Sequence, residues 1–299
     1  MNAELSVEVI DRSPLAIAGA EELMAGHDLV SPFVWSAHGT THLLVCAIPH
    51  ALGTTDPTGE IYAGTMDQPG QFRMCPSPAI TPGLEFADLG GVEDPAVVVD
   101  AMGGTRVFYT GIGADRQTSA LMVAQGAELS ALHKRPVKFD PPEGQRGLRR
   151  AVVRQGADGS WRMFYEFIAH GAARIGCAVA GDLDGPWEPA GGIIGPRSHA
   201  WDAGHVSTGP IVNLPGAPPV MFYNGACGDG SWGVGWIAFD ENLARVVGRC
   251  DAPILGGAGR GEGIFAASCV TADGATWLYY APDDGLLGRA RVERVRVTG

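Results

Sequence analysis

Two pairs of adjacent charged residues stand at the starts of apolar segments and could carry chemistry. Glu93 and Asp94 open the segment DPAVVV, and Arg149 and Arg150 open RRAVVR. Carboxylates donate or accept protons, and arginines bind anions through forked N–H groups. These charges are costly to remove from water without a partner or a ligand, so a shared pocket would be a candidate binding site. The alternative is an ion network between Asp94 and an arginine that serves only the fold.

The elements that must position these pairs belong to a fivefold internal repeat. One apolar run recurs at spacings of 63, 56, 58 and 57 residues. Each copy is short, β-branched or aromatic, and flanked by turn residues, which is typical of a strand. The copies are HLLVCAI (42–48), RVFYTGI (106–112), RMFYEFI (162–168), VMFYNGA (220–226) and WLYYAPD (277–283), aligned on Cys46, Tyr109, Tyr165, Tyr223 and Tyr280.

Three further runs accompany these central strands. An apolar run lies 13 or 14 residues before each one, and Gly/Asp turns between several of these pairs predict hairpins. A run rich in small residues follows, and then a run with proline, which cannot donate to a ladder and therefore favours an outer edge. Four antiparallel strands repeated five times predict an all-β fold, a five-bladed β-propeller forming one domain over residues 1–299. A pair of β-sandwiches is the alternative.

The last repeat lacks its proline-bearing fourth strand. The missing strand is expected at the other end of the chain, in DRSPLAI (11–17) with Pro14. The N-terminal strand would then complete the fifth blade and close the ring, which removes exposed sheet edges. The first strands of the blades would line the axis, where their starting residues converge. These are Ser31, Asp94, Arg150, Gly209 and Ala266, with Glu93, Arg149 and Thr208 beside them.

Composition excludes several classes of partner. The net charge of -12 argues against nucleic acid and against anionic membranes, and no apolar run approaches the roughly 18 residues of a membrane span. The N-terminus lacks a basic n-region and an apolar h-region, so a cytoplasmic location is expected. The six cysteines are scattered without a C-x-x-C pair, so we expect no metal. No phosphate-binding glycine motif follows a strand, so we expect no cofactor.

Several segments resemble glycoside hydrolase family 130, the β-mannoside phosphorylases and mannosidases. GGVEDPAVVVD (90–100) is similar to the E-D-P motif of that family, and SPFVW (31–35) to its first-blade strand. WDAGHVSTGPIV (201–212) and LYYAPDDGLLGRA (278–290) resemble its fourth-blade segment and its late Y-Y motif. The matches keep their order over nearly the whole chain. The resemblance implies a five-bladed propeller independently of the repeat.

The resemblance also implies roles for individual residues. Asp94 would be the general acid, which in this family acts on the glycosidic oxygen through a sugar hydroxyl. Asp284 would hold the sugar in the −1 subsite, and Ser31 would also touch it. Glu93, Arg149 and Arg150 are expected to line the same pocket. Cleavage of a glycosidic bond needs an acid at the leaving oxygen and a nucleophile on the opposite face.

The chain departs from the phosphorylases where they bind phosphate. Ala96 and Cys46 stand where the family often has arginines, Glu166 lies in place of a cation, and Asn224 replaces a histidine. Fewer cations are left to bind phosphate, and a carboxylate is present that could activate water. These differences favour water as the nucleophile, with Glu166 as the general base. Asn224 is kept as a substrate contact.

Asp202 and His205 are expected in the loop before the first strand of the fourth blade, GPIVN (209–213). Asp202 is an alternative base, and His205 is a possible substrate contact.

Three functions remain open at this level. The first is an inverting glycosidase acting on a β-mannoside or related glycoside. The second is a phosphorylase in which Arg149 and Arg150 bind phosphate. The third is a sugar-binding propeller without catalysis, and a relative of the five-bladed arabinanases and xylosidases is a weaker fourth. All of them predict a glycoside or oligosaccharide partner.

Overall fold

A computed structural model describes residues 5–50, 58–83, 87–100, 103–228, 230–257, 263–283 and 285–296, with only the backbone at 295 and 296. Within these ranges the chain is almost entirely β-strand, as the sequence predicts, with a single short helix, α1 (Glu21–Gly26). No helix in the described part is long and apolar enough to cross a membrane.

Four of the six sheets found among these residues follow the predicted repeat. The first has the order β2-β6-β5-β4-β3, with β2 (Ala16–Ala18), β3 (His27–Ala37), β4 (Thr40–Pro49), β5 (Glu60–Gln68) and β6 (Gln71–Ile80). The second has the order β10-β9-β8-β7, with β7 (Gly91–Val99), β8 (Thr105–Ile112), β9 (Ser119–Gly126) and β10 (His133–Pro136). The third has the order β11-β12-β13-β14, with β11 (Arg146–Gln155), β12 (Trp161–Ala169), β13 (Ala172–Ala180) and β14 (Glu188–Pro189).

The C-terminal sheet contains the N-terminal strand. Its order is β1-β25-β24-β23, with β1 (Leu5–Pro14), β23 (Ile264–Ala272), β24 (Ala275–Pro282) and β25 (Gly288–Arg296). β1 runs antiparallel to β25 and pairs Val7 with Arg294 and Pro14 with Gly288. The expected pairing of the N-terminal strand is therefore confirmed, although the strand begins at Leu5 and ends at Pro14.

The fourth repeat forms two sheets where the sequence predicts one. β15 (His205–Ser207), β18 (Asn224–Ala226), β19 (Trp232–Val234) and β22 (Leu255–Gly256) form one sheet, and β16 (Ile211–Asn213), β17 (Pro219–Met221), β20 (Ile237–Phe239) and β21 (Val246–Arg249) form the other. The break in the first strand has a local cause. A side chain at Gly209 would collide with the carbonyl oxygen of Phe222, and Pro210 has no N–H to donate.

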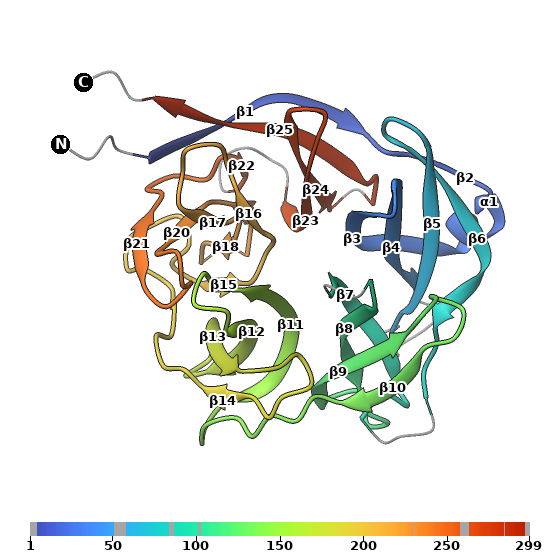
Figure 1. The fold of residues 1–299 in the computed structure, drawn as a ribbon, viewed down its shortest axis with the longest axis horizontal. Coiled ribbons are helices and arrows are strands. Elements are labelled where there is room, and N and C mark those ends of the chain that lie inside the picture. The colour runs from blue at the N-terminus through green and yellow to red at the C-terminus, as the bar shows by residue number, and fades with distance from the viewer. Residues whose placement is uncertain are drawn as a thin grey trace.

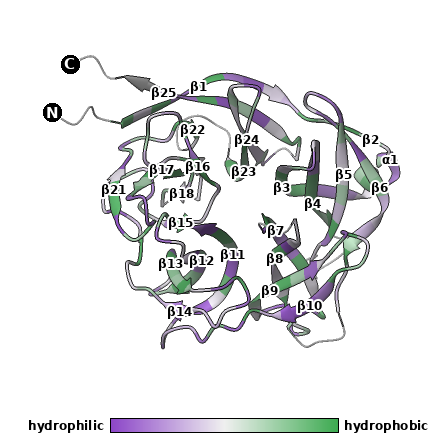
Figure 2. Ribbon diagram, in the orientation of Figure 1, coloured by the Kyte–Doolittle hydropathy of each residue, from purple (hydrophilic) through white to green (hydrophobic). Residues whose placement is uncertain are grey.

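The sheets are arranged around a common centre, with β3, β7, β11, β15, β16 and β23 on the inside (Figure 1). Hydrophobic residues recur along the strands around this whole arrangement (Figure 2). The buried residues form clusters that each join neighbouring sheets. Leu44 packs with Tyr109, Phe108 with Tyr165, Phe164 with Tyr223, Phe222 with Tyr280, and Tyr279 with Leu43.

The inner strands share one irregularity that aims their side chains. The pairing register shifts between Val30 and Phe33 in β3, Glu93 and Ala96 in β7, and Arg149 and Val152 in β11. Such a bulge inserts an extra residue and redirects a side chain. Inside these three bulges the backbone adopts positive φ angles of 52°, 53° and 53°, at Ser31, Asp94 and Arg150. The three residues that were expected to converge therefore occupy equivalent bulge positions.

Candidate active site

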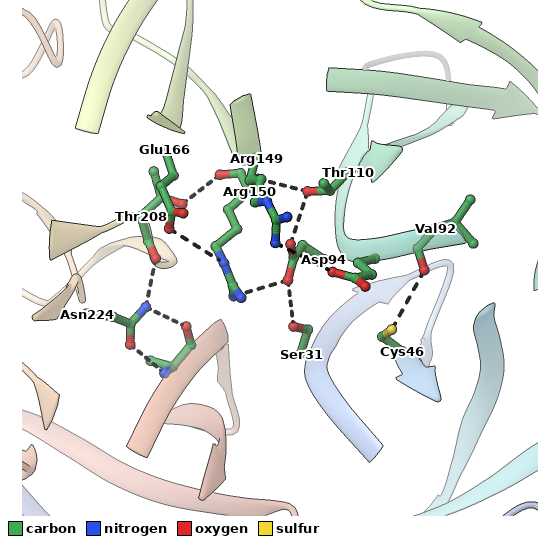
Figure 3. Close-up of polar contacts among 12 residues, drawn as sticks. Ser31, Cys46, Val92, Asp94, Thr110, Arg149, Arg150, Glu166, Thr208 and Asn224 are labelled. Carbon is green, nitrogen blue, oxygen red and sulfur yellow. Dashed lines mark hydrogen bonds and ion pairs between the residues drawn. The ribbon is translucent and has the colours of Figure 1, made fainter. Parts of the chain in front are cut away.

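Asp94 is the centre of a polar group on the inner strands. Its Oδ1 accepts a hydrogen bond from Ser31 Oγ at 2.9 Å and lies 3.1 Å from Arg150 Nη1. Its Oδ2 accepts a hydrogen bond from Thr110 Oγ1 at 3.0 Å (Figure 3). The residue is only 7% exposed. These three partners, one of them charged, hold the Asp94 carboxyl group in one orientation.

Arg150 lies between two carboxylates. Its Nε is 3.6 Å from Glu166 Oε2, and its guanidinium carbon lies 4.1 Å from the centre of the Phe265 ring. Burial lowers the pKa of Arg150, but Asp94, Glu166 and Glu93 together outweigh it and raise that pKa. One guanidinium group therefore contacts both carboxyl groups.

Glu93 and Arg149 extend this group. Their side chains approach to 4.0 Å between Glu93 Oε2 and Arg149 Nη1. Burial, followed by the charge of Asp94, raises the pKa of Glu93, while both arginines act in the opposite direction. The group thus contains three carboxyl groups and two guanidinium groups.

Part of this group borders a small central cavity of about 30 Å³, which is well below the roughly 300–1,000 Å³ of ligand pockets. Ser31, Asp94 and Arg150 supply its polar wall, and Phe265 its aromatic wall. The remaining lining residues are Pro95, Ala96, Ala151, Val152, Thr208, Gly209, Ala266 and Ala267. A larger surface groove, lined by Trp236 and Arg294 among others, contains none of the residues of this group.

Hydrogen bonds between sheets hold the inner strands in place. Besides the bond from Ser31 to Asp94, these join Arg150 N to Thr110 Oγ1, Thr208 Oγ1 to Arg150 O, Ala266 N to Asn224 Oδ1, and Ser268 Oγ to Pro32 O. They form a cycle around the centre, which fixes the backbone that positions the charged group.

Asn224 belongs to this cycle and contributes no free polar atom to the cavity. Its Nδ2 donates to Thr208 O at 2.7 Å and to Ala266 O at 3.0 Å, and its Oδ1 accepts from Ala266 N at 2.7 Å. The residue is fully buried. It therefore holds two sheets together, and we do not retain it as a substrate contact.

Asp202 is also fully buried, in a separate ion network. Arg197 Nε donates to both of its oxygens at 3.1 and 3.2 Å, Tyr223 Oη donates to Oδ2 at 2.6 Å, and Arg249 forms a further ion pair. None of these partners contacts Asp94. A fully buried carboxyl group that binds two arginines and a tyrosine is unsuited to activate water, so Asp202 is not retained as a base.

A matching network in the second sheet shows that this arrangement is structural. Asp88 accepts from Tyr109 Oη at 2.9 Å and pairs with Lys134 at 2.8 Å. Asp88 and Asp202 each stand 21 residues before the tyrosine that they bind. That equal spacing within the repeat is a sequence signal for a structural role.

His205 lies outside the charged group. Its Nδ1 accepts a hydrogen bond from Ala173 N at 3.1 Å, and its ring stacks on Trp232. Asp284, expected to hold a sugar, falls outside the described residues.

Two residues of the site were not predicted. Thr110 follows the repeat position of Tyr109, just as Glu166 follows Tyr165, so the alignment of the copies contains a signal for it. Phe265, one residue before the predicted inner strand position Ala266, has no such signal.

The described residues contain no group of three or more His, Cys, Asp or Glu side chains that could hold a metal ion. Cys46 is buried, and burial raises the pKa of its thiol well above the ordinary value. The thiol is therefore neutral, at a position where the family that the sequence motifs resemble often has an arginine.

Neither a protein-family model nor a curated protein sequence matches the chain. Solved structures do match its fold. A glycosyl hydrolase from Bacteroides ovatus is 19% identical, with a TM-score of 0.73 over 89% of this chain and 84% of that one. A structure reported for the GH130 family of mannoside phosphorylases, said to contain hydrolases of β-1,2-mannosidic linkages in Candida mannan, is 20% identical, with a TM-score of 0.74 over 89% and 84%.

The β-1,2-mannobiose phosphorylase from Listeria innocua is 15% identical, with a TM-score of 0.70 over 99% of this chain and 97% of that one. These similarities show that the chain has the fold of glycoside hydrolase family 130, which confirms the resemblance found in its sequence motifs.

Proposed function

We propose that this chain is a glycoside hydrolase that cleaves a β-mannoside or a related glycoside with inversion in its central cavity. The observation that carries the proposal is that Asp94 lines that cavity and that Arg150 joins it to a second carboxyl group, Glu166. The shared fold with hydrolases and phosphorylases of mannosides supports the substrate class.

The proposal includes a closed five-bladed propeller. The two sheets over residues 205–256 would be the two ends of one blade, because each of the four chain segments contributes one strand to each sheet. The cycle of hydrogen bonds between inner strands and the core clusters between neighbouring sheets support closure. This geometry brings Ser31, Asp94, Arg150, Thr208 and Phe265, one from each blade, to one pocket.

In the proposed reaction Asp94 donates a proton towards the glycosidic oxygen, and Glu166 accepts a proton from the attacking water. Asp94 must first take up a proton, so its ion pair with Arg150 at 3.1 Å must loosen when a sugar enters. Arg150 can then turn fully to Glu166 and hold that carboxylate in place. Ser31 and Thr110 keep Asp94 oriented throughout.

Electrostatics favours water over phosphate as the nucleophile. A phosphate with close to two negative charges would have to compete with three carboxyl groups for the two arginines of the site. Arg150 is shared by Asp94 and Glu166, and Arg149 faces Glu93 at 4.0 Å. The neutral Cys46 and Ala96 add no cation. Phosphorolysis stays the second candidate, because two arginines do border the site and a phosphorylase shares the fold.

Product analysis tests this proposal. The protein is incubated with β-1,2-mannobiose with and without inorganic phosphate, and the products are separated by chromatography. Free mannose at the same rate in both reactions is expected. Mannose 1-phosphate formed only with phosphate would establish the phosphorylase instead, and sugar binding without either product would leave a binding protein. Glu166→Gln should abolish release of mannose if Glu166 is the base, and NMR of the first-formed anomer checks inversion.

A further inference from the structure

An arginine without an ion pair lies near the end of the strand that contains Arg150. Arg154 follows Arg150 by four residues on β11, so the two lie up to about 13 Å apart along the strand. Arg154 Nη1 donates to the carbonyl oxygen of Ile211 at 3.2 Å, but among the described residues the side chain forms no ion pair. Since arginine has five N–H donors, those that the described residues leave unused are available to a ligand.

The surroundings of Arg154 do not stabilise its charge. Burial lowers the pKa of its guanidinium group, and the Cys269 thiol, whose own pKa is raised by burial, is neutral. Directly opposite Arg154 in the β11–β12 pair is a second arginine, Arg162, which has its own ion pair with Asp158 at 3.6 Å. Like charges at opposite positions of two paired strands are destabilising. The described residues therefore leave an excess positive charge here, which points to an anionic ligand.

Arg154 lines an open groove of about 440 Å³, which is within the range of ligand pockets. The groove lies beside the turns that follow β11 and β16, and it shares no lining residue with the central cavity. Two hydrogen bonds fix its wall, because Ala157 N donates to Glu241 O at 3.1 Å and Asp158 N donates to Asn242 Oδ1 at 3.0 Å. The groove is therefore formed before any ligand enters.

The groove combines a cation with groups that bind hydroxyls. The forked N–H groups of Arg154 match phosphate oxygens. Glu241 and Asn213 also line the groove, and their carboxyl and amide oxygens accept hydrogen bonds. The Glu241 carboxylate would repel a bare anion, whereas a ligand with both an anionic group and hydroxyl groups satisfies both sides. Pro218 and Pro219 add an apolar surface.

We propose that this groove binds a sugar phosphate, with the phosphate on Arg154 and sugar hydroxyl groups on Glu241 and Asn213. The inference goes beyond the proposed function and does not depend on it, because the groove is separate from the cavity that Asp94 lines.

Calorimetric titration of mannose 6-phosphate, with inorganic phosphate and mannose for comparison, tests the groove. The wild type should bind mannose 6-phosphate more tightly than either of the other two, and mannose should not displace it. Arg154→Gln removes the charge-assisted hydrogen bonds to the phosphate and should weaken binding about ten- to hundredfold. Arg154→Lys keeps the charge without the fork, so it should lose less, and it guards against misfolding of the glutamine variant.

Arg146→Gln is the matched control, because Arg146 begins the same strand, also forms no ion pair among the described residues, and lines a different groove. An equal loss in Arg146→Gln, displacement by mannose, or no binding of mannose 6-phosphate by the wild type would overturn the proposal.

Glu241→Gln separates the sugar from the phosphate. It should strengthen binding of inorganic phosphate, which the carboxylate no longer repels, and weaken binding of mannose 6-phosphate, whose hydroxyl group loses a charged acceptor. Stronger binding of both ligands would overturn the assignment to a sugar phosphate. None of these titrations requires cleavage of a glycoside, so the groove and the proposed function are tested separately.

Discussion

Asp94→Asn separates the chemical role of Asp94 from its structural role. The substitution keeps the shape of the side chain and removes the proton that Asp94 would donate. Ser31 Oγ and Arg150 Nη1 can still donate to the remaining oxygen, but the new amide nitrogen faces Thr110 Oγ1, which already accepts the N–H of Arg150. One hydrogen bond and one ion pair are therefore weakened.

The stability cost should be small. A hydrogen bond to a charged group contributes about 1.5–3 kcal/mol. Arg150 keeps Glu166 as a partner, and its side chain is 26% exposed, so solvent compensates part of the loss. We expect the free energy of unfolding to fall by about 1–2 kcal/mol, measured by urea denaturation.

The catalytic cost should be large and should depend on the leaving group. General acid catalysis contributes roughly 10²–10⁴-fold, so kcat/KM for β-1,2-mannobiose should fall by about that factor. A 2,4-dinitrophenyl β-mannoside needs no proton on its leaving group, so its kcat/KM should fall less than about tenfold. Asp88→Asn is the matched control, because Asp88 is a buried carboxylate bound to Tyr109 and Lys134.

That control should lose stability without changing the ratio between the two substrates. Equal losses for both substrates in Asp94→Asn, or mannobiose cleavage within tenfold of the wild type, would refute Asp94 as the acid. The proton donor would then have to be sought at Glu93, whose pKa is raised by burial and by the charge of Asp94.

Three further predictions concern the surroundings of the site. Asp202→Asn leaves Arg197 and Arg249 without their shared anion and should lower the free energy of unfolding by about 3 kcal/mol in urea, with the substrate ratio unchanged; a loss below about 1 kcal/mol would contradict the network. Asn224→Ala orphans buried backbone groups and should cost about 2–3 kcal/mol in the same assay, and a neutral result would argue against its clamping role. The raised pKa of Glu93 means that the folded protein holds the proton of this carboxyl group more tightly than the unfolded chain does. The free energy of unfolding of the wild type should therefore decline as the pH rises from the ordinary pKa of 4.5 through the raised pKa, and Glu93→Gln should show a smaller decline in urea titrations at successive pH values. Identical pH dependence in both proteins would exclude this contribution of Glu93.

The strand repeat was predictable because it depends on local chemistry. Aromatic and β-branched runs, turn glycines and edge prolines recur at regular spacing, and even the pairing of β1 with β25 follows from one missing strand. The short helix α1 and strand β2 were not predicted, since neither has a copy elsewhere in the repeat. The break at Gly209 and Pro210 depends on how closely Phe222 approaches, which spacing alone does not reveal.

The site was predictable only where the repeat itself aims the side chain. Ser31, Asp94 and Arg150 were found as strand starts, although the strands in fact begin earlier and these residues occupy bulges. The environments of Asp202 and Asn224 depend on contacts with residues up to 47 and 42 positions away. The sequence does not reveal such contacts. A polar side chain that is open to solvent therefore cannot be told from a buried one whose hydrogen bonds are all made within the protein.

The three bulges with positive φ give the protein equivalent backbone positions that carry different side chains. Ser31, Asp94 and Arg150 have nearly the same positive φ angle, yet one carries a neutral hydroxyl, one a carboxyl group and one a cationic guanidinium group. Each non-glycine residue in this conformation costs about 1–2 kcal/mol, which a packed ring can tolerate. Evolution could therefore replace the side chain at one bulge position at a time without changing the backbone of the surrounding sheets. Related enzymes that use water or phosphate on one scaffold are a natural outcome of that freedom.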